Sequence, residues 1–257
     1  MVPGMLPASG LKFLVVQPDV LTGPERFADA LRKLGADIEI ITGEEVSQIS
    51  VQDFDGTIVM GGAMGDADTQ KFPWLEDIRN LLRQTYDMGQ PTLGICLGAQ
   101  LMASALGGRV AVGSAGLEAG VVSVRKTQAA QQDPLLGDLP IEFDVAEMHF
   151  DAIEQLPDDA ILLVRGETYP HQGFRIGNSW AVQFHPEISV STYRIWLAEI
   201  PNAANQLQES VLASIARFEE ADEHLQATCR ALASNFVGIA TNLKAHHSAV
   251  IGASEIS

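Results

Sequence analysis

The sequence predicts an α/β fold with a mostly parallel central sheet and helices on both faces. Over the first hundred residues, short apolar runs rich in β-branched residues alternate with segments of helical spacing. Between Arg109 and His185 the chain changes to many short β-like runs separated by Gly, Pro and Asp, typical of additional strands, some of them antiparallel. From about Gln206 the spacing is helical again, which predicts a C-terminal helical extension.

The first half of the chain supplies the predicted parallel strands and the helices between them. Each strand is a short run of apolar residues, as in strands that are buried on both faces. The first two helices have apolar residues three and four apart and stop at Gly35 and Gly89. The predicted strands are 11–17, 36–42, 54–60 and 91–95, and the predicted helices are 24–34, 74–88 and 97–106.

The middle of the chain adds the other predicted strands. They are 109–112, 120–125, 141–145, 161–165 and 180–184. With 257 residues, of which 46% are hydrophobic, the chain can bury a sizeable core. We expect residues 1–200 to form one domain and residues 201–257 to form the extension.

The C-terminal helical region carries a narrow apolar seam. Its residues follow spacings of four and three, the pattern of a coiled coil, and they are Val211, Ile215, Phe218, Leu225, Cys229, Leu232, Phe236, Ile239 and Leu243. Such a seam fits one terminal helix, or two helices broken near Gly238, packed on the domain. It also fits an interface with a second copy of the chain or with a partner protein.

Charge and cysteine usage restrict the partners and the compartment. A formal net charge of −17 would repel a phosphate backbone, so we expect no binding to nucleic acid. The two cysteines, Cys96 and Cys229, are too few for a disulfide framework and indicate a reducing cytoplasm. The first residues lack the pattern of a secretory signal, and no apolar stretch reaches the ~20 residues that cross a bilayer. We therefore expect a cytoplasmic protein that does not bind membranes.

Cys96 lies between a predicted strand and a predicted helix, with Gly94 and Gly98 two positions to either side. This pattern is typical of the elbow that presents a nucleophile, with Cys in place of Ser. The strained turn requires glycine where neighbouring side chains would collide. The helix N-terminus favours a thiolate, and the Leu97 N–H can stabilise an oxyanion. The sequence therefore predicts a nucleophile here and disfavours an ordinary buried cysteine.

His185 is the histidine best placed to serve as the base for such a nucleophile. It follows a predicted strand, and Pro186 restrains it to an extended conformation. Because side chains two residues apart in an extended segment point the same way, Glu187 should lie beside His185. One imidazole nitrogen can then bond Glu187 while the other faces the thiol, which is the nucleophile–base–orienter arrangement.

A glycine-rich loop, Gly61-Gly62-Ala63-Met64-Gly65, follows the third predicted strand. It matches neither the P-loop pattern nor the dinucleotide-binding pattern. A backbone N–H of such a loop can instead face the oxyanion that develops in acyl transfer. We therefore interpret the loop as part of an oxyanion hole.

Together, the cysteine elbow, the Phe184-His185-Pro186-Glu187 segment and the Gly61-Gly62 loop resemble the class I (triad) glutamine amidotransferases. The order and spacing of the motifs agree with that family over roughly residues 11–200, most closely with stand-alone proteins similar to the glutaminase domain of GMP synthase. The resemblance implies a flavodoxin-like fold, and we expect neither a cofactor nor a metal.

The resemblance also implies the roles of the site residues. Cys96 would attack the side-chain amide of glutamine, His185 would shuttle the proton, and Glu187 would orient His185. Gly62 and Leu97 would form the oxyanion hole. The residues that would contact the substrate are Gly61, Gln100, His149 and Asp151. The chain departs from the family pattern at Ala63, where Pro usually follows Gly-Gly, and at Phe150, where His-Gly-Asp is common.

Three functions compete at this point. The first is a glutaminase that releases glutamate and supplies ammonia to a partner synthetase or ligase, since no ATP-binding loop is evident in the chain. The second is a γ-glutamyl hydrolase or peptidase, which uses the same triad and needs no partner. The third is a redox-sensing or chaperone-like protein with a cysteine elbow, which the paired His185 and Glu187 disfavour. A homodimer is compatible with each.

Overall fold

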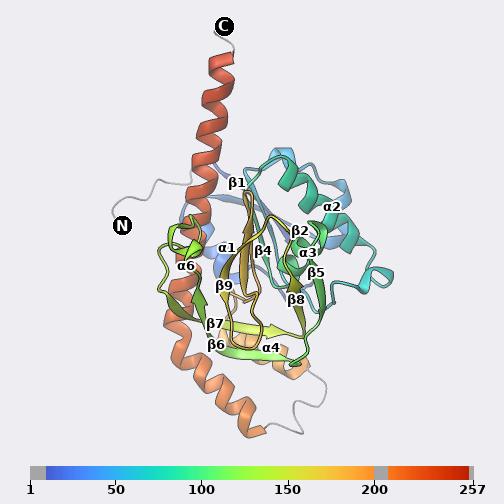
Figure 1. The fold of residues 1–257 in the computed structure, drawn as a ribbon, viewed down its shortest axis with the longest axis vertical. Coiled ribbons are helices and arrows are strands. Elements are labelled where there is room, and N and C mark those ends of the chain that lie inside the picture. The colour runs from blue at the N-terminus through green and yellow to red at the C-terminus, as the bar shows by residue number, and fades with distance from the viewer. Residues whose placement is uncertain (1–9, 200–207, 255–257) are drawn as a thin grey trace.

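A nine-stranded mixed sheet forms the centre of the molecule in the computed structural model, which describes residues 10–199 and 208–254 (Figure 1). The strand order is β2-β1-β3-β4-β11-β10-β9-β6-β7, and β5 and β8 form a separate pair. The strands are β1 (Lys12–Gln17), β2 (Asp37–Thr42), β3 (Gly56–Val59), β4 (Thr92–Ile95), β5 (Arg109–Val112), β6 (Glu118–Lys126), β7 (Glu142–His149), β8 (Asp151–Gln155), β9 (Ile161–Arg165), β10 (Gly173–Ile176) and β11 (Ser179–Val182).

The five strands β2, β1, β3, β4 and β11 are parallel, and the remaining four of the sheet are antiparallel to their neighbours. Period-two alternation in β1 sends Phe13 and Val15 to one face and Leu14 and Val16 to the other. All four side chains are fully buried, because helices cover both faces. The predicted fold class, including the added antiparallel strands, is confirmed.

The helices are α1 (Glu25–Lys33), α2 (Trp74–Asp87), α3 (Leu97–Ala105), α4 (Val190–Glu199) and α6 (Gln208–Ser254), with short 3₁₀ helices at Gly43–Gln48, Val51–Asp53, Asp68–Gln70 and Ala129–Gln132. Helices α1 and α6 pack on the face that holds Phe13, and α2 and α3 pack on the face that holds Leu14 (Figure 1). No described helix is long and apolar enough to cross a membrane.

The long helix α6 uses its apolar seam within the chain. Phe236 contacts the ring of Phe13 at 5.4 Å between centroids, and Phe218 stacks on Tyr193 of α4 at 5.0 Å. The helix is continuous through Gly238, so the predicted alternative of two broken helices is wrong. Its last turns extend past the sheet (Figure 1). The side chain of Val211, the first seam position, lies outside the described residues.

Sequence patterns missed three elements. Strand β8 begins directly after β7, where a single bend at Phe150 separates two strands that join different sheets. Strand β10 carries too few apolar residues to stand out in the sequence. Helix α4, with its Val, Thr, Tyr, Ile and Trp, has the composition of a strand. It is helical because the oxygen of Ser189 accepts the N–H of Thr192, and because Tyr193 and Trp196 are buried against the domain.

Candidate active site

Cys96 sits at the turn between β4 and α3 with φ 50° and ψ −107°, a conformation that residues with side chains rarely adopt. Its N–H donates to the carbonyl of Val182 at the end of β11, 2.9 Å away. The residue is 5% exposed. As the first residue of α3, Leu97 has an N–H without a partner inside the helix, directed at the same end as the sulfur.

Two glycines make this turn possible. A Cβ on Gly94 would lie 2.6 Å from the carbonyl oxygen of Gly98, and a Cβ on Gly98 would lie 2.1 Å from that of Val59 in β3. Both contacts are with backbone, which cannot move aside without displacing a strand or the helix. The spacing seen in the sequence therefore reflects the close packing of α3 against β3 and β4.

His185 lies between Cys96 and Glu187. Its Nδ1 is 2.7 Å from Oε1 of Glu187, and it is also hydrogen-bonded to Cys96, for which the other ring nitrogen, Nε2, remains available. The backbone N–H of His185 donates to Ala146 of β7 at 2.8 Å, and the edge of its ring meets Trp196 of α4 at 4.7 Å between centroids. The extended segment after β11 thus fixes the imidazole on three sides.

Burial, the strongest influence, lowers the pKa of His185, but the charges of Cys96 and Glu187 and the bonds to them raise it further. The net effect holds the pKa well above the ordinary value of histidine. Glu187 is fully buried, and its carboxylate has the imidazole as its partner. The arrangement therefore stabilises an imidazolium next to the sulfur, which is the state that follows transfer of the thiol proton.

The glycine-rich loop is held in one orientation by the segment after β1. The hydroxyl of Thr22 donates to the carbonyl oxygen of Gly61 at 2.6 Å, and a carboxylate oxygen of Asp19 accepts the N–H of Ala63 at 3.2 Å. With the Gly61 carbonyl turned to Thr22, the N–H of the same peptide, on Gly62, points the opposite way. No described residue accepts a hydrogen bond from that N–H.

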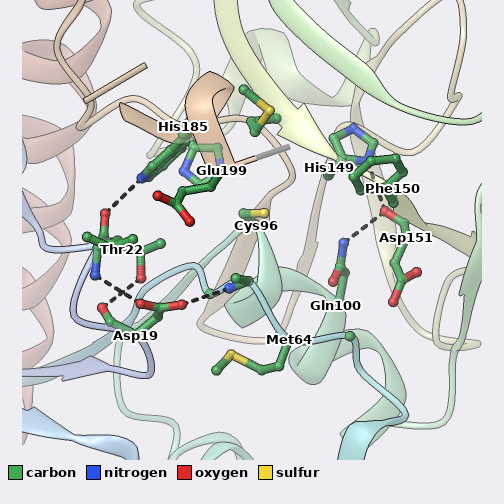
Figure 2. A pocket seen from close by; sticks show the side chains of 16 residues that line it. Asp19, Thr22, Met64, Cys96, Gln100, His149, Phe150, Asp151, His185 and Glu199 are labelled. Atoms are coloured by element: carbon green, nitrogen blue, oxygen red, sulfur yellow. Dashed lines mark hydrogen bonds between the residues drawn. The ribbon is translucent and has the colours of Figure 1, made fainter. Parts of the chain in front are cut away.

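A cavity of about 330 Å³ opens above Cys96 (Figure 2). Figure 2 shows Gln100, His149, Phe150 and Asp151 on one side of the sulfur and Asp19, Thr22 and Glu199 on the side of His185. Of the residues predicted from the sequence, the cavity is lined by Gly62, Cys96, Gln100, His149, Asp151 and His185. Gly61, Leu97 and Glu187 lie behind this lining.

Gln100, one turn into α3, has its amide nitrogen committed to two acceptors. It donates to the backbone carbonyl of Asp151 at 2.9 Å and to the side chain of Gln183 at 3.3 Å. Its carbonyl oxygen stays free to accept from a bound ligand. Burial raises the pKa of Asp151, whose carboxylate takes the backbone N–H of Asp66 and so ties the glycine-rich loop to β8.

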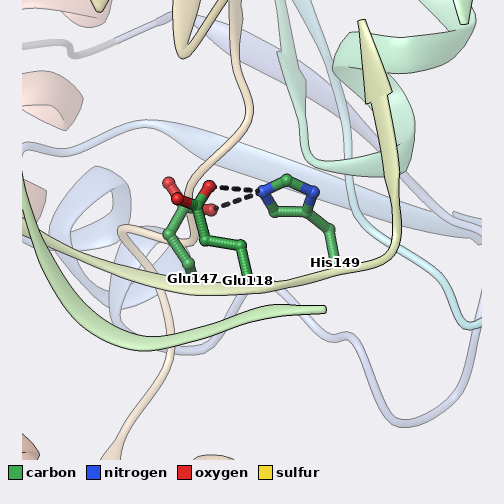
Figure 3. A group of neighbouring side chains, drawn as sticks. All are labelled: Glu118, Glu147 and His149. Carbon is green, nitrogen blue, oxygen red and sulfur yellow. Dashed lines mark hydrogen bonds and ion pairs between the residues drawn. The ribbon is translucent and has the colours of Figure 1, made fainter. Parts of the chain in front are cut away.

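His149 is the centre of a buried polar cluster with Glu118 and Glu147, all on the paired strands β6 and β7 (Figure 3). Its Nδ1 is 2.8 Å from the carbonyl of Asp151, and its Nε2 is 3.0 Å from Glu118 and 3.4 Å from Glu147. Within the described ranges, this is the group that could hold a metal ion. A proton serves the same atoms equally well.

The two carboxyl groups of the cluster differ in protonation. Burial and then the charge of Glu118 raise the pKa of Glu147 well above its ordinary value. Burial also acts upward on Glu118, but the hydrogen bonds from His149, Thr168 and Gln172 outweigh it and lower that pKa. The structure therefore favours a neutral Glu147 beside an ionised Glu118.

Glu147→Gln is expected to make stability less dependent on pH. Because the pKa of Glu147 is higher in the folded state than its ordinary value of 4.5, the folded protein holds the extra proton, and stability falls as pH rises above that value. Glutamine does not titrate, so the melting temperature of the variant should gain on that of the wild type, by a few degrees between about pH 5 and pH 8. Exposed Glu167→Gln is the matched control. A difference that stays flat with pH would show that Glu147 is ionised in the fold.

Sequence patterns did not point to Asp19, Thr22, Trp196 or Glu199. Asp19 and Thr22 looked like ordinary turn residues after the first strand, and their contacts with the loop at 61–63 span about forty positions. Trp196 and Glu199 belong to α4, which the patterns missed. The acidic partners of His149 also come from strand pairing, which no local motif announces.

Comparisons with known proteins agree with this geometry. A family model described as "Glutamine amidotransferase class-I" matches residues 24–198. The glutamine-hydrolysing subunit of GMP synthase from Natronomonas pharaonis is 34% identical over 162 residues, covering 62% of this chain and 79% of that protein. Gamma-glutamyl peptidase 5 of Arabidopsis thaliana is 30% identical over 154 residues, 58% of this chain and 59% of that protein. The crystal structure of a glutamine amidotransferase from Thermotoga maritima shares the fold, with a TM-score of 0.78, 23% identity, and coverage of 88% of this chain and 98% of that one.

Proposed function

Because the chain belongs to the class I glutamine amidotransferase family, we propose that it hydrolyses the side-chain amide of glutamine at Cys96 and supplies the ammonia to a partner synthetase. The observation that carries this proposal is His185, which is bonded to both Cys96 and Glu187 at the floor of the cavity. A relative of the chain is named a glutamine-hydrolysing GMP synthase subunit, which supports both the substrate and the need for a partner.

The first half of the reaction makes a thioester. His185 accepts the proton of Cys96, and the sulfur attacks the γ-carbonyl carbon of glutamine. The carbonyl oxygen becomes an oxyanion, which the N–H groups of Leu97 and Gly62 stabilise. When the C–N bond breaks, the imidazolium gives its proton to the leaving nitrogen, and ammonia departs from the γ-glutamyl thioester.

The second half returns the enzyme to its starting state. His185 takes a proton from water, the hydroxide attacks the thioester, and glutamate leaves as the thiol regains its proton. Glu187 keeps Nδ1 of the imidazole occupied throughout, so that Nε2 is always the nitrogen that faces the reaction. The fixed tautomer is the physical contribution of the carboxylate.

A second function, γ-glutamyl peptidase activity without a partner, has its own support. Gamma-glutamyl peptidase 5 matches this chain at 30% identity. The cavity of about 330 Å³ lies within the size range of small-molecule sites and has room beyond the sulfur. The purified protein should therefore be assayed for release of glutamate from glutamine and from γ-glutamyl dipeptides in parallel. Glutamine turnover supports the first function, whereas turnover of dipeptides alone favours the second. Turnover of neither would contradict both.

Thr22→Val is expected to lower kcat by about 10–100-fold with little change in KM. Valine keeps the shape of threonine but cannot donate to the Gly61 carbonyl, so the Gly61–Gly62 peptide loses the bond that aims its N–H at the oxyanion. The measurement is steady-state hydrolysis of glutamine, with Thr22→Ser as the variant that restores the hydroxyl. A kcat equal to the wild type in Thr22→Val would show that the loop needs no such anchor.

The loop anchor also bears on the Ala63 departure from the family pattern. Proline has no N–H and would hold this position through its ring. Alanine instead donates to Asp19, so that a hydrogen bond takes over the stiffening role. We propose on this basis that the oxyanion loop is formed before a partner binds.

Location, assembly and domain limits complete the proposal. A cytoplasmic location is favoured by two free, buried cysteines. The catalytic domain is taken as residues 1–200, and 201–257 as an extension whose seam packs on it from Phe218 onward. A homodimer would have to use surface other than this seam, because its central positions are already covered by the domain.

A further inference from the structure

The cavity has two sides that receive different parts of a γ-glutamyl amide. The scissile carbonyl must lie at Cys96, so the glutamyl end extends to one side and the amine that leaves extends to the other. His185 protonates the leaving nitrogen in the proposed function, so the amine occupies the His185 side. Figure 2 shows that Asp19, Thr22 and Glu199 line this side, opposite Gln100 and Asp151.

The leaving-group side is acidic with an apolar wall. Asp19 follows β1, and Glu199 is the last residue of α4. Leu21 and Trp196 add apolar surface, and the indole N–H of Trp196 is fixed on the Leu21 carbonyl at 2.9 Å. No lysine or arginine is among the described residues that line the cavity, and the sequence of 200–207, which follows Glu199, contains none.

These charges select among leaving groups. Ammonia leaves no group on this side, and an amino acid leaving group would bring its carboxylate against Asp19 and Glu199. An amine with a second, protonated nitrogen would instead place its methylene chain on Leu21 and Trp196 and its ammonium near the carboxylates. The face of an indole also attracts such a cation.

We propose that this site cleaves γ-glutamyl amides whose amine part carries a second positive charge, with a short alkyl diamine as the simplest case. The inference rests on the proposed function, because it uses the same thioester chemistry. The Cys96 sulfur bonds the γ-carbonyl carbon, the amide C–N bond breaks, and His185 passes the thiol proton to the departing amine. Water then releases glutamate and restores the thiol, so that no further reactant is needed.

Three synthetic probes of equal length test the charge preference. They are the γ-glutamyl amides of 1,4-diaminobutane, of n-pentylamine and of 4-aminobutyrate, whose amine parts end in a cation, a methyl group and a carboxylate. We expect kcat/KM to fall in that order, with the cationic probe ahead of the neutral one by about threefold or more at low salt. The advantage should shrink as salt is added, because these carboxylates are reached by solvent.

Glu199→Gln separates the site from the overall charge of the protein. No hydrogen bond or ion pair of Glu199 is present in the described part of the chain, so the change removes a charge with little structural cost. The ratio of kcat/KM for the cationic probe to that for the neutral probe should fall by about two- to threefold, mainly through a higher KM for the cationic probe. Exposed Glu167→Gln, outside the cavity, should leave the ratio at its wild-type value.

The outcomes distinguish this inference from the function beneath it. If glutamine is hydrolysed but the cationic and neutral probes are cleaved equally, or the anionic probe is preferred, the charge preference is wrong and the glutaminase stands. The same conclusion follows if Glu199→Gln leaves the ratio unchanged. If no γ-glutamyl compound is cleaved by folded protein, both proposals are overturned together.

Discussion

Cys96→Ala is expected to reduce glutamine hydrolysis by about 10⁴–10⁶-fold, to the level left by binding alone. The thioester cannot form without the sulfur, and neither His185 nor the oxyanion donors can supply a substitute nucleophile. The turn should survive, because alanine at φ 50° is no more strained than cysteine. Ammonia release and the melting temperature, measured on the same preparation, check both parts.

The other cysteine provides the matched control for this variant. Cys229 is buried in α6 against the sheet, where burial raises the pKa of its thiol to about 12. Cys229→Ala should lose some stability to the cavity it leaves while turnover stays near that of the wild type. If Cys96→Ala kept substantial turnover, or if Cys229→Ala alone abolished it, Cys96 would not be the nucleophile.

His185→Gln is expected to lower kcat by about 10³–10⁴-fold while KM changes little. Glutamine can still bond Glu187, but it can neither accept the thiol proton nor give one to the leaving nitrogen. The glutamine-binding side of the cavity, at Gln100 and Asp151, is left in place. Steady-state kinetics and the rate at which iodoacetamide alkylates Cys96 are the two measurements, because both depend on the thiolate that His185 stabilises.

His171→Gln is a control that changes the same residue type outside the cavity. His171 bonds the carbonyl of Ile153 at 2.7 Å, a contact that a glutamine amide can replace. Its kinetics should match the wild type. A loss of kcat in His171→Gln as large as in His185→Gln would point to damage to the fold and would undermine the role assigned to His185.

The parallel half of the fold could be read from the sequence because its strands are buried on both faces. Runs such as Phe13–Val16 are apolar throughout, and the observed strands β1 to β4 start or end within two residues of their predicted limits. Helix α4 could not be read this way. Its residues favour strands, and it is helical because Tyr193 and Trp196 find partners on the domain, a tertiary effect that outweighs local preference.

The same division applies to the candidate site. Cys96 with its glycines, and His185 with Glu187, are local patterns whose geometry follows from a few neighbouring residues. Thr22 and Asp19 act on a loop about forty residues away, and Glu118 meets His149 through the pairing of β6 with β7. Such contacts depend on the order of strands in the sheet, which periodicity does not encode.

The charge of the leaving-group side belongs to the second kind. Asp19 and Glu199 are about 180 positions apart in the chain and come together through the packing of α4 beside the loop that follows β1. The net charge of −17 indicates an acidic protein but does not place any carboxylate at the site. Only the folded arrangement turns this composition into an expectation about substrates.

The most direct test of the proposed chemistry is to trap the thioester. Wild-type protein mixed with glutamine and quenched in acid within one turnover should gain the mass of one γ-glutamyl group, and peptide mapping should place it on Cys96. His185→Gln should acquire the group far more slowly. Rapid turnover of glutamine without a γ-glutamyl group on Cys96 at any quench time, or with the group on another residue, would contradict a thioester mechanism at this site.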